Sequence, residues 1–129
     1  MWPRVNGMRA LALGTPGELR ARLNRLVLSG AKSATAGLLT EYADEGEELE
    51  HVGERLSLVD DDDAQVGVVE VTDVRVVPLR EVTWEFAAAE GEGDASLDEW
   101  RAGHVAYWSR LGQQVTDETE IVCIRFRMS

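Results

Sequence analysis

Cysteine and long apolar stretches are almost absent from this chain of 129 residues. Cys123 is the only cysteine, so the chain cannot form an internal disulfide, and its apolar neighbours predict a buried small side chain. No stretch approaches the length of a membrane-spanning helix, and the N-terminal segment has no apolar region followed by a cleavage site. We therefore expect a cytoplasmic protein without a membrane partner, with residues 1–129 forming a single domain.

Lysine is also scarce, and positive charge of any kind is in the minority. The chain has 24 acidic and 13 basic residues, for a formal net charge of -11, and Lys32 is its only lysine. Non-specific binding to nucleic acids depends on lysines and arginines that neutralise phosphates. The composition therefore argues against a protein that coats long RNA or DNA. It does not argue against a pocket for one nucleoside or a short single strand.

Two longer helices are predicted by apolar stripes that follow a capping residue. The first spans 16–29, with Thr15 as its cap and Gly30 in a left-handed conformation after its end. The second spans 97–111 and begins after Ser96, which is again a capping residue.

Three runs rich in β-branched and aromatic residues predict strands over 55–59, 66–77 and 120–128. The apolar parity of the second run changes near residues 72–73, which predicts a β-bulge there. A short helix over 84–90 separates the second run from the third. This order indicates an α+β fold, in which a small, mainly antiparallel β-barrel is flanked by helices.

Two acidic segments are predicted to be exposed to solvent. Residues 41–54 carry no sustained apolar period, and Asp60 to Asp63 place four carboxylates in a row. Successive side chains cannot all point at one ion, and His104 has no cysteine or second histidine nearby in the sequence. We therefore expect a loop, an exposed turn, and neither a metal site nor another cofactor.

The segment after the first helix is the most informative about chemistry. Lys32 and Thr35 lie three residues apart, where the chain leaves the helix and leads into a first strand. A helical turn would place the amine beside the hydroxyl, whereas an extended strand would point them to opposite faces. The competing interpretation, which composition alone favours, is a surface lysine beside a turn threonine.

A glycine-spaced acidic loop and the last helix supply further candidates. The glycines around Glu90 and Glu92 let the backbone approach a ligand and leave the acids room to reach into a cleft. His104, Tyr107 and Trp108 are candidates for binding or stacking a nucleobase, and His104 can titrate near neutral pH. Taken alone, the loop is more simply a charged connection, and the aromatic residues are more simply part of a core.

Together these segments resemble the ASCH domain, a family of the PUA-like β-barrel superfamily. The stretch GAKSATAGL is similar to the family's G-x-K-x-x-T motif. VVEVTDV, the A-x-x-E-G of residues 87–91, and EGDASLDEWRAGHVAYW follow in the family's order. The similarity runs from about residue 15 to the C-terminus. It implies a PUA-like barrel with a cleft between barrel and helices, and a ligand drawn from RNA or its nucleosides.

One bacterial branch of this family consists of amidohydrolases that remove the acetyl group from N(4)-acetylcytidine. Their lysine, threonine and glutamate correspond here to Lys32, Thr35 and Glu90, while the Glu-Gly-Glu-Gly-Asp insertion makes Glu92 a rival for Glu90. The resemblance thus implies an amidohydrolase that acts on a modified nucleoside. Other members have been linked to RNA binding or cleavage, so the alternatives are a non-catalytic module for RNA or modified bases, and a ribonuclease.

Amide hydrolysis by this set of residues contains a conflict. Thr35 can attack only if a base takes its proton, and a neutral Lys32 would be such a base. Removing the proton of a lysine at pH 7 costs roughly 4.6 kcal/mol in water, and a nearby ionised Glu90 adds to that cost. Either Lys32 is the base and Glu90 serves the leaving group, or Lys32 stays cationic and stabilises the oxyanion. The sequence leaves both open.

Overall fold

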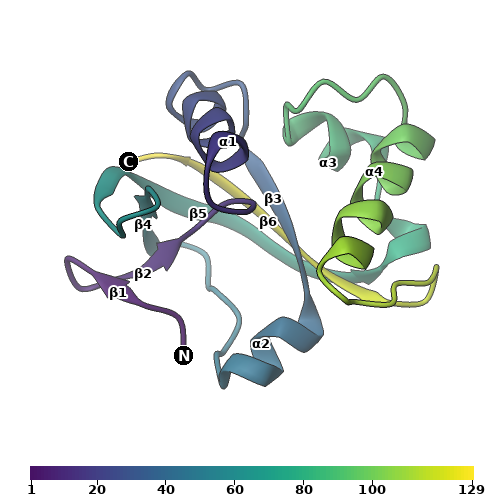
Figure 1. The fold of residues 1–129 in the computed structure, drawn as a ribbon, viewed down its shortest axis with the longest axis horizontal. Helices are drawn as coiled ribbons and strands as arrows, with labels where there is room; N and C mark the ends of the chain where they lie inside the picture. Colours follow the sequence, from purple (N-terminus) through teal and green to yellow (C-terminus); the bar gives the residue numbers. More distant parts are fainter.

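A computed structural model describes all residues 1–129, in which helices lie between groups of one or two strands along the chain (Figure 1). The strands are β1 (Arg4–Val5), β2 (Met8–Leu11), β3 (Ala34–Leu38), β4 (Arg55–Val59), β5 (Gln65–Pro78) and β6 (Glu120–Met128). The helices are α1 (Glu18–Leu28), α2 (Leu39–Glu45), α3 (Trp84–Ala89) and α4 (Leu97–Arg110), with a 3₁₀ turn, η1, at Leu79–Glu81. None of these helices has both the length and the apolar composition needed to cross a membrane.

All six strands belong to one sheet with the order β1-β2-β4-β5-β6-β3. Neighbouring strands are antiparallel, except that β2 and β4 run parallel. The end strands β1 and β3 do not pair with each other, so the sheet is not closed. The α+β class and the mainly antiparallel pairing predicted from the sequence are confirmed.

The long strand β5 changes its side-chain parity in the middle. Its register against β6 shifts between Val71 and Asp73, which confirms the predicted bulge. Val69 and Val71 are buried before the shift, and Val74 packs against the same core after it. The extra residue at the bulge therefore keeps odd-numbered and even-numbered valines on one face of the sheet.

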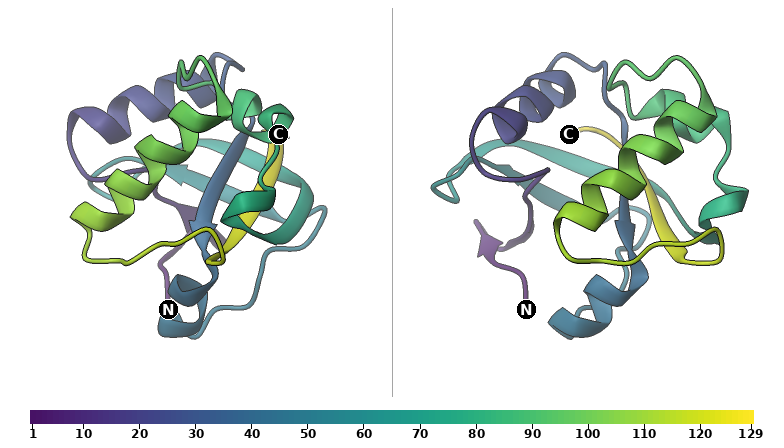
Figure 2. Two further views of the ribbon diagram at one scale, coloured as in Figure 1. Left: turned by 90° about the vertical axis from the view of Figure 1, so that its right-hand side faces the viewer. Right: turned by 45° about the vertical axis from the view of Figure 1, so that its right-hand side comes forward.

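Two hydrophobic cores lie on opposite faces of β6. Val122, Ile124 and Phe126 belong to the core that includes side chains of α1, whereas Ile121 and Cys123 belong to the core of α3 and α4. Alternate residues of a strand point to opposite faces, so helices on both sides bury most of this strand. Figure 2 shows α1, α3 and α4 arranged around β3 and β6. The burial of Cys123 agrees with the sequence prediction.

The helix ends follow the predicted signals only in part. α1 begins at Glu18, because Gly17 has a φ of 103° that no helix contains, and no side chain caps this end. The predicted cap at Thr15 is therefore wrong. Gly30 does adopt the left-handed conformation after the helix, with a φ of 84°. Ser96 caps α4 and accepts a hydrogen bond from the backbone N–H of Glu99.

The N-terminal strands and α2 were not predicted, and residues 41–54 are not a wholly solvated loop. α2 covers the first part of this segment, and both Tyr42 and Glu50 are buried. Tyr42 joins the core on the α1 side, where Trp2 packs edge-on against it at 4.8 Å between ring centres. Asp61 to Asp63 form an exposed turn, as expected.

Candidate active site

One cavity of about 570 Å³ is bordered by α1, α2, α4 and the strands β2 and β3. Its size lies within the range of roughly 300–1,000 Å³ that is typical of sites for small ligands. It brings together segments from both halves of the chain. The residues singled out from the sequence all line it: Lys32, Thr35, Glu90, Glu92, His104, Tyr107 and Trp108.

The turn between α1 and β3 buries the single lysine of the chain. The backbone N–H of Lys32 donates to the carbonyl of Leu26, which holds the turn against the end of α1. The Lys32 side chain is 2% exposed. Its Nζ donates to the carbonyl of Ala34 at 2.8 Å and to Oε2 of Glu92 at 2.9 Å. Two oxygen acceptors, one of them a carboxylate, stabilise the ammonium form of this side chain.

Close backbone contacts hold the loop between α3 and α4 against this turn. The backbone N–H of Ser33 donates to the carbonyl of Ala89 at 2.8 Å. Gly91 has a φ of 66°, and a Cβ added there would lie 1.9 Å from the carbonyl oxygen of Ala31. Only glycine permits this approach. It places Glu90 and Glu92, on either side of Gly91, next to the turn that holds Lys32.

Glu90 and His104 form a second charged pair inside the cavity wall. Glu90 is 1% exposed, and its Oε2 accepts a hydrogen bond from Nε1 of Trp100 at 3.0 Å. The same oxygen lies 3.0 Å from Nε2 of His104, while Nδ1 of His104 lies 3.0 Å from the carbonyl of Trp100. Both ring nitrogens of His104 therefore face acceptors, an arrangement that the doubly protonated imidazolium satisfies best. The ring also stacks on Trp100, with centres 4.1 Å apart.

The pKa values of this pair move in opposite directions. Burial by itself raises the pKa of Glu90, but the hydrogen bond from His104 and the nearby charge of Lys32 outweigh it and lower the pKa. Burial lowers the pKa of His104, but the hydrogen bond to Glu90 and its charge raise the pKa above the usual value. Both shifts favour the charged forms of the pair, the carboxylate and the imidazolium. We call Lys32, Glu90, Glu92 and His104 the lysine cluster.

Thr35 reaches the same cavity from β3. Its backbone pairs with Ile124 of β6, and its side chain is half-buried. The sequence allowed either a helical turn or an extended strand from Lys32 to Thr35. Neither describes this segment fully, because Lys32 lies in an irregular turn before β3. The lysine side chain folds back over this turn to the carbonyl of Ala34, so both residues line one cavity although only Thr35 is in a strand.

The two aromatic candidates of α4 differ in exposure. Trp108 is 2% exposed and belongs to the core of α3 and α4. Its ring meets His104 edge-on, with centres 5.4 Å apart. Tyr107 is half-buried, and burial raises its pKa. Tyr107 therefore offers the more accessible ring to a ligand, whereas Trp108 mainly supports His104.

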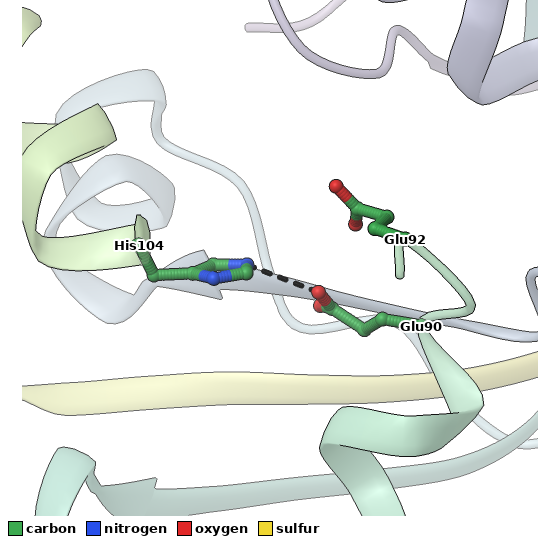
Figure 3. Close-up of side chains that lie close together, drawn as sticks. All are labelled: Glu90, Glu92 and His104. Carbon is green, nitrogen blue, oxygen red and sulfur yellow. Dashed lines mark ion pairs between the residues drawn. The ribbon is translucent and has the colours of Figure 1, made fainter. Parts of the chain in front are cut away.

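Glu90, Glu92 and His104 are close enough to surround a metal ion, with ligand atoms within 4.8 Å of one another (Figure 3). The three residues are not free, however. Glu92 is bound by the Lys32 ammonium, and Nε2 of His104 faces Glu90, as the dashed line in Figure 3 marks. A metal here would have to displace both contacts. The arrangement is already neutral, with two cationic and two anionic side chains.

A second polar group, which the sequence did not indicate, lies at the same cavity, and three of its four members, Arg9, Tyr42 and Glu50, line it. It consists of Arg9 on β2, Tyr42 on α2, and Glu50 and Glu54 on the loop that follows; we call it the arginine cluster. The Tyr42 hydroxyl donates to Glu50 at 2.8 Å, and both glutamates approach the Arg9 guanidinium. The sequence did contain a signal for α2, the helix that carries Tyr42. The spacing of Leu38, Leu39 and Tyr42 matches a helix with one apolar side.

The fold and this charged, helix-covered cavity are those of a PUA-like protein. Comparison with known families shows which family within this class the chain belongs to. The model of the ASCH domain family matches residues 9–129. The chain belongs to the ASCH domain family. A comparison with curated proteins gives no significant match.

Two crystal structures are similar over most of the chain. One is a protein from Enterococcus faecalis V583 and the other is an ASCH domain from Lactobacillus crispatus JV V101, each with 28% identity and a TM-score of 0.80. Each comparison covers 92% of this chain, and 74% and 77% of the respective relative. A mutant ASCH protein from Zymomonas mobilis shares the fold alone, at 10% identity and a TM-score of 0.56 over 83% of this chain and 63% of its own.

Proposed function

We propose that this ASCH protein hydrolyses an acyl amide on a modified nucleoside such as N(4)-acetylcytidine. The observation that carries the proposal is the convergence of Lys32, Thr35 and Glu92 on one cavity, although the lysine and the glutamate are sixty residues apart. These residues supply a cation, a hydroxyl and a carboxylate, which are the groups that amide hydrolysis requires. The bacterial amidohydrolases that the sequence resembles use the same residue types.

The size of the cavity and the net charge of the chain favour a nucleoside over a polymer. A cavity of about 570 Å³ suits a small ligand. The formal net charge of -11 repels the phosphates of long RNA. An acylated nucleoside carries no phosphate, so neither restriction applies to it.

Lys32 acts in this mechanism as a cation and not as a base. Its ammonium is bound by a carboxylate and a carbonyl, and deprotonation would weaken both contacts. A buried ammonium is well suited to stabilise the negative oxygen that forms when the acyl carbonyl is attacked. We therefore assign Lys32 to the stabilisation of the oxyanion and not to proton transfer.

Thr35 is the nucleophile and Glu92 takes its proton. The threonine oxygen bonds to the acyl carbon, and the carbonyl electron pair moves to the oxygen beside Lys32. When the intermediate collapses, the carbon–nitrogen bond breaks and the proton on Glu92 passes to the leaving nitrogen. Water then cleaves the acyl-threonine ester by the same route, which releases the acid and restores Thr35.

Glu90 has a supporting role, because its carboxylate is bound by Trp100 and His104 and its pKa is lowered. A carboxylate with a lowered pKa is a weak base. Its charge instead contributes to holding the neighbouring cations in place. Glu92 lines the cavity and is less buried, with 21% of its side chain exposed, so we assign it as the carboxylate that reaches the Thr35 proton.

The test is hydrolysis of N(4)-acetylcytidine by the purified protein, followed as release of cytidine. The wild type and Thr35→Ser should release cytidine, whereas Thr35→Val should not, because valine keeps the shape but lacks the hydroxyl. Thr40→Val is the matched control, since Thr40 is exposed on α2 and does not line the cavity. Wild-type rates in Thr35→Val would remove the covalent mechanism.

Two other outcomes would replace the proposal. Tight binding of nucleosides without turnover of any amide would make the chain a binding module for modified bases. Cleavage of single-stranded RNA that depends on Lys32 would make it a ribonuclease.

A further inference from the structure

The arginine cluster is built unlike an ordinary structural ion pair. Arg9 is 9% exposed and Glu50 is 8% exposed, so both charges are withdrawn from water. The guanidinium makes one good hydrogen bond, from an Nη to the carbonyl of Glu48 at 2.8 Å. Its carboxylate contacts are longer, at 3.7 Å to Glu50 and 3.5 Å to Glu54. A buried guanidinium normally makes shorter and better-aligned contacts than these.

One donor of this cluster has no partner. Nε of Arg9 is buried and forms no hydrogen bond, although it lies 3.5 Å from Oε2 of Glu54. Most buried polar atoms in folded proteins are hydrogen-bonded, and an unpaired donor costs about 1–3 kcal/mol. Arg9, Tyr42 and Glu50 all line the cavity that contains the lysine cluster. The chain therefore satisfies the Arg9 guanidinium incompletely, and a ligand in this cavity can add an acceptor to it.

We infer that the arginine cluster is a second subsite of the cavity, which binds the ribose hydroxyls of a nucleoside whose acyl amide lies at the lysine cluster. This inference rests on the proposed function and adds the part of the substrate that the lysine cluster does not contact. Glu50 accepts hydrogen bonds from the sugar hydroxyls, and the Arg9 guanidinium donates to a hydroxyl oxygen. A vicinal diol offers both a donor and an acceptor, which matches this pair.

The charge of the subsite selects a sugar and rejects a phosphate. Arg9 is the single cation, and Glu50 and Glu54 both lie within 4 Å of it. The cluster thus carries an excess of negative charge, which repels a 5′-phosphate. Trp2 and Tyr42 pack edge-on beside it and provide an apolar wall for the carbon skeleton of the sugar.

The position of the two clusters in the chain suits a ligand that spans both. Lys32 precedes β3, whereas Tyr42 lies in the helix that follows it. A five-residue strand separates its end Cα atoms by about 13 Å, at a rise of ~3.3 Å per residue. Thr35 and Gly37 of this strand line the cavity between the two ends. The base would lie along β3, with its acyl amide at one end and its sugar toward the other.

The experiment measures the affinities of cytidine, 2′-deoxycytidine, cytosine and cytidine 5′-monophosphate by calorimetry. A hydrogen bond to a charged group contributes about 1.5–3 kcal/mol, so cytidine should bind roughly 10- to 100-fold more tightly than 2′-deoxycytidine. Glu50→Gln should bring this ratio close to one, and the monophosphate should bind more weakly than cytidine. Cytosine, which has no sugar, is the reference ligand.

Two further variants separate the subsite from the fold. Tyr42→Phe keeps the packing of the ring but leaves Glu50 without its donor, so it should change the ratio less than Glu50→Gln. Glu70→Gln is the control, because Glu70 pairs with Arg127 on the sheet surface and does not line the cavity. Its ratio should equal that of the wild type.

The outcomes distinguish this inference from the proposed function. Sugar discrimination that depends on Glu50, without hydrolysis of any amide, would support the subsite and overturn the proposed reaction. Hydrolysis of ribose and deoxyribose substrates at equal rates, unchanged in Glu50→Gln, would overturn the subsite alone. Tighter binding of the monophosphate than of cytidine would also overturn it, and no binding of any nucleoside would overturn both.

Discussion

The lysine cluster and the arginine cluster line one cavity, but they satisfy their charges differently. In the lysine cluster each cation has its own carboxylate, at 2.9 Å for Lys32 and Glu92 and 3.0 Å for His104 and Glu90. In the arginine cluster two carboxylates share Arg9 at 3.5 Å and 3.7 Å, and the Nε that faces Glu54 forms no hydrogen bond. Short, balanced pairs suit a preorganised reaction centre, whereas a loose cluster with a free donor suits binding. The clusters should therefore respond differently to substitution.

The largest difference is expected in catalysis. Lys32→Met removes the group that stabilises the oxyanion, so kcat should fall about 10²- to 10³-fold. Arg9→Met should mainly raise KM, because the arginine contacts the sugar and not the reacting atoms. Steady-state kinetics of both variants on N(4)-acetylcytidine separate the two effects. An equal loss of kcat in both variants would contradict separate roles in catalysis and binding for the two clusters.

Lys32→Arg sharpens the role of the lysine. A guanidinium keeps the positive charge but does not act as a base at neutral pH. Partial activity in Lys32→Arg is therefore expected, above that of Lys32→Met. If both variants are equally inactive while near-UV circular dichroism shows an intact fold, Lys32 is the base after all.

The next largest difference concerns stability. Glu90→Ala removes a carboxylate that is almost fully buried and leaves His104 and the Trp100 N–H without their acceptor, which should cost about 3 kcal/mol of unfolding free energy. Glu50→Ala should cost less, about 1–2 kcal/mol, because Arg9 keeps Glu54 and the carbonyl of Glu48. Urea denaturation of the two variants gives both values. A larger loss in Glu50→Ala would show that the arginine cluster is the more important for folding.

A third difference lies in how the backbone supports the lysine cluster. Gly91→Ala should destabilise the protein, because the new Cβ would lie 1.9 Å from the carbonyl oxygen of Ala31. Gly93→Ala is the matched control, since Gly93 also has a positive φ but a Cβ there meets nothing within 4 Å. A left-handed alanine costs about 1–2 kcal/mol at either site, and the clash should add about 1–3 kcal/mol at Gly91 only. Equal thermal stability of the two variants would contradict the close contact.

Local signals were sufficient for much of the fold. Ser96 caps α4, Gly30 follows α1 in the left-handed conformation, and the parity change in β5 marks its bulge. Each of these depends on a few neighbouring residues. The short strands β1 and β2 could not be predicted in this way, since β2 pairs with β4, a strand more than forty residues later in the chain. α2 was missed because its acidic residues conceal a short apolar side.

The candidate site, like the fold, could be predicted from the sequence only in part. The resemblance to the ASCH motif pointed to Lys32, Thr35 and Glu90, and the acidic insertion that departs from the motif added Glu92; all four line the cavity. The motif could not show that Lys32 pairs with Glu92 and that Glu90 pairs with His104, because these contacts depend on how the loop after α3 packs against the turn before β3. Arg9 was missed because an arginine in a short N-terminal strand carries no motif.

The smallest expected effect is the pH dependence of stability that the Glu90–His104 pair causes. The folded-state pKa of His104 is raised, so its contribution is complete below its unfolded value of about 6.5 and is lost as the pH rises through the folded pKa. The folded-state pKa of Glu90 is lowered, so its contribution is complete above about 4.5 and is lost only at lower pH. The thermal midpoint should therefore decline as the pH rises from 6 to 9.

The two histidines of the chain provide the control for this effect. His104→Gln should flatten the decline, because glutamine does not titrate. His51→Gln, which removes the other histidine of the chain from an exposed position beside Glu54, is the comparison. NMR titration of the two imidazole rings should place the pKa of His104 above 6.5. A decline that is identical in wild type and His104→Gln would show that another group causes it.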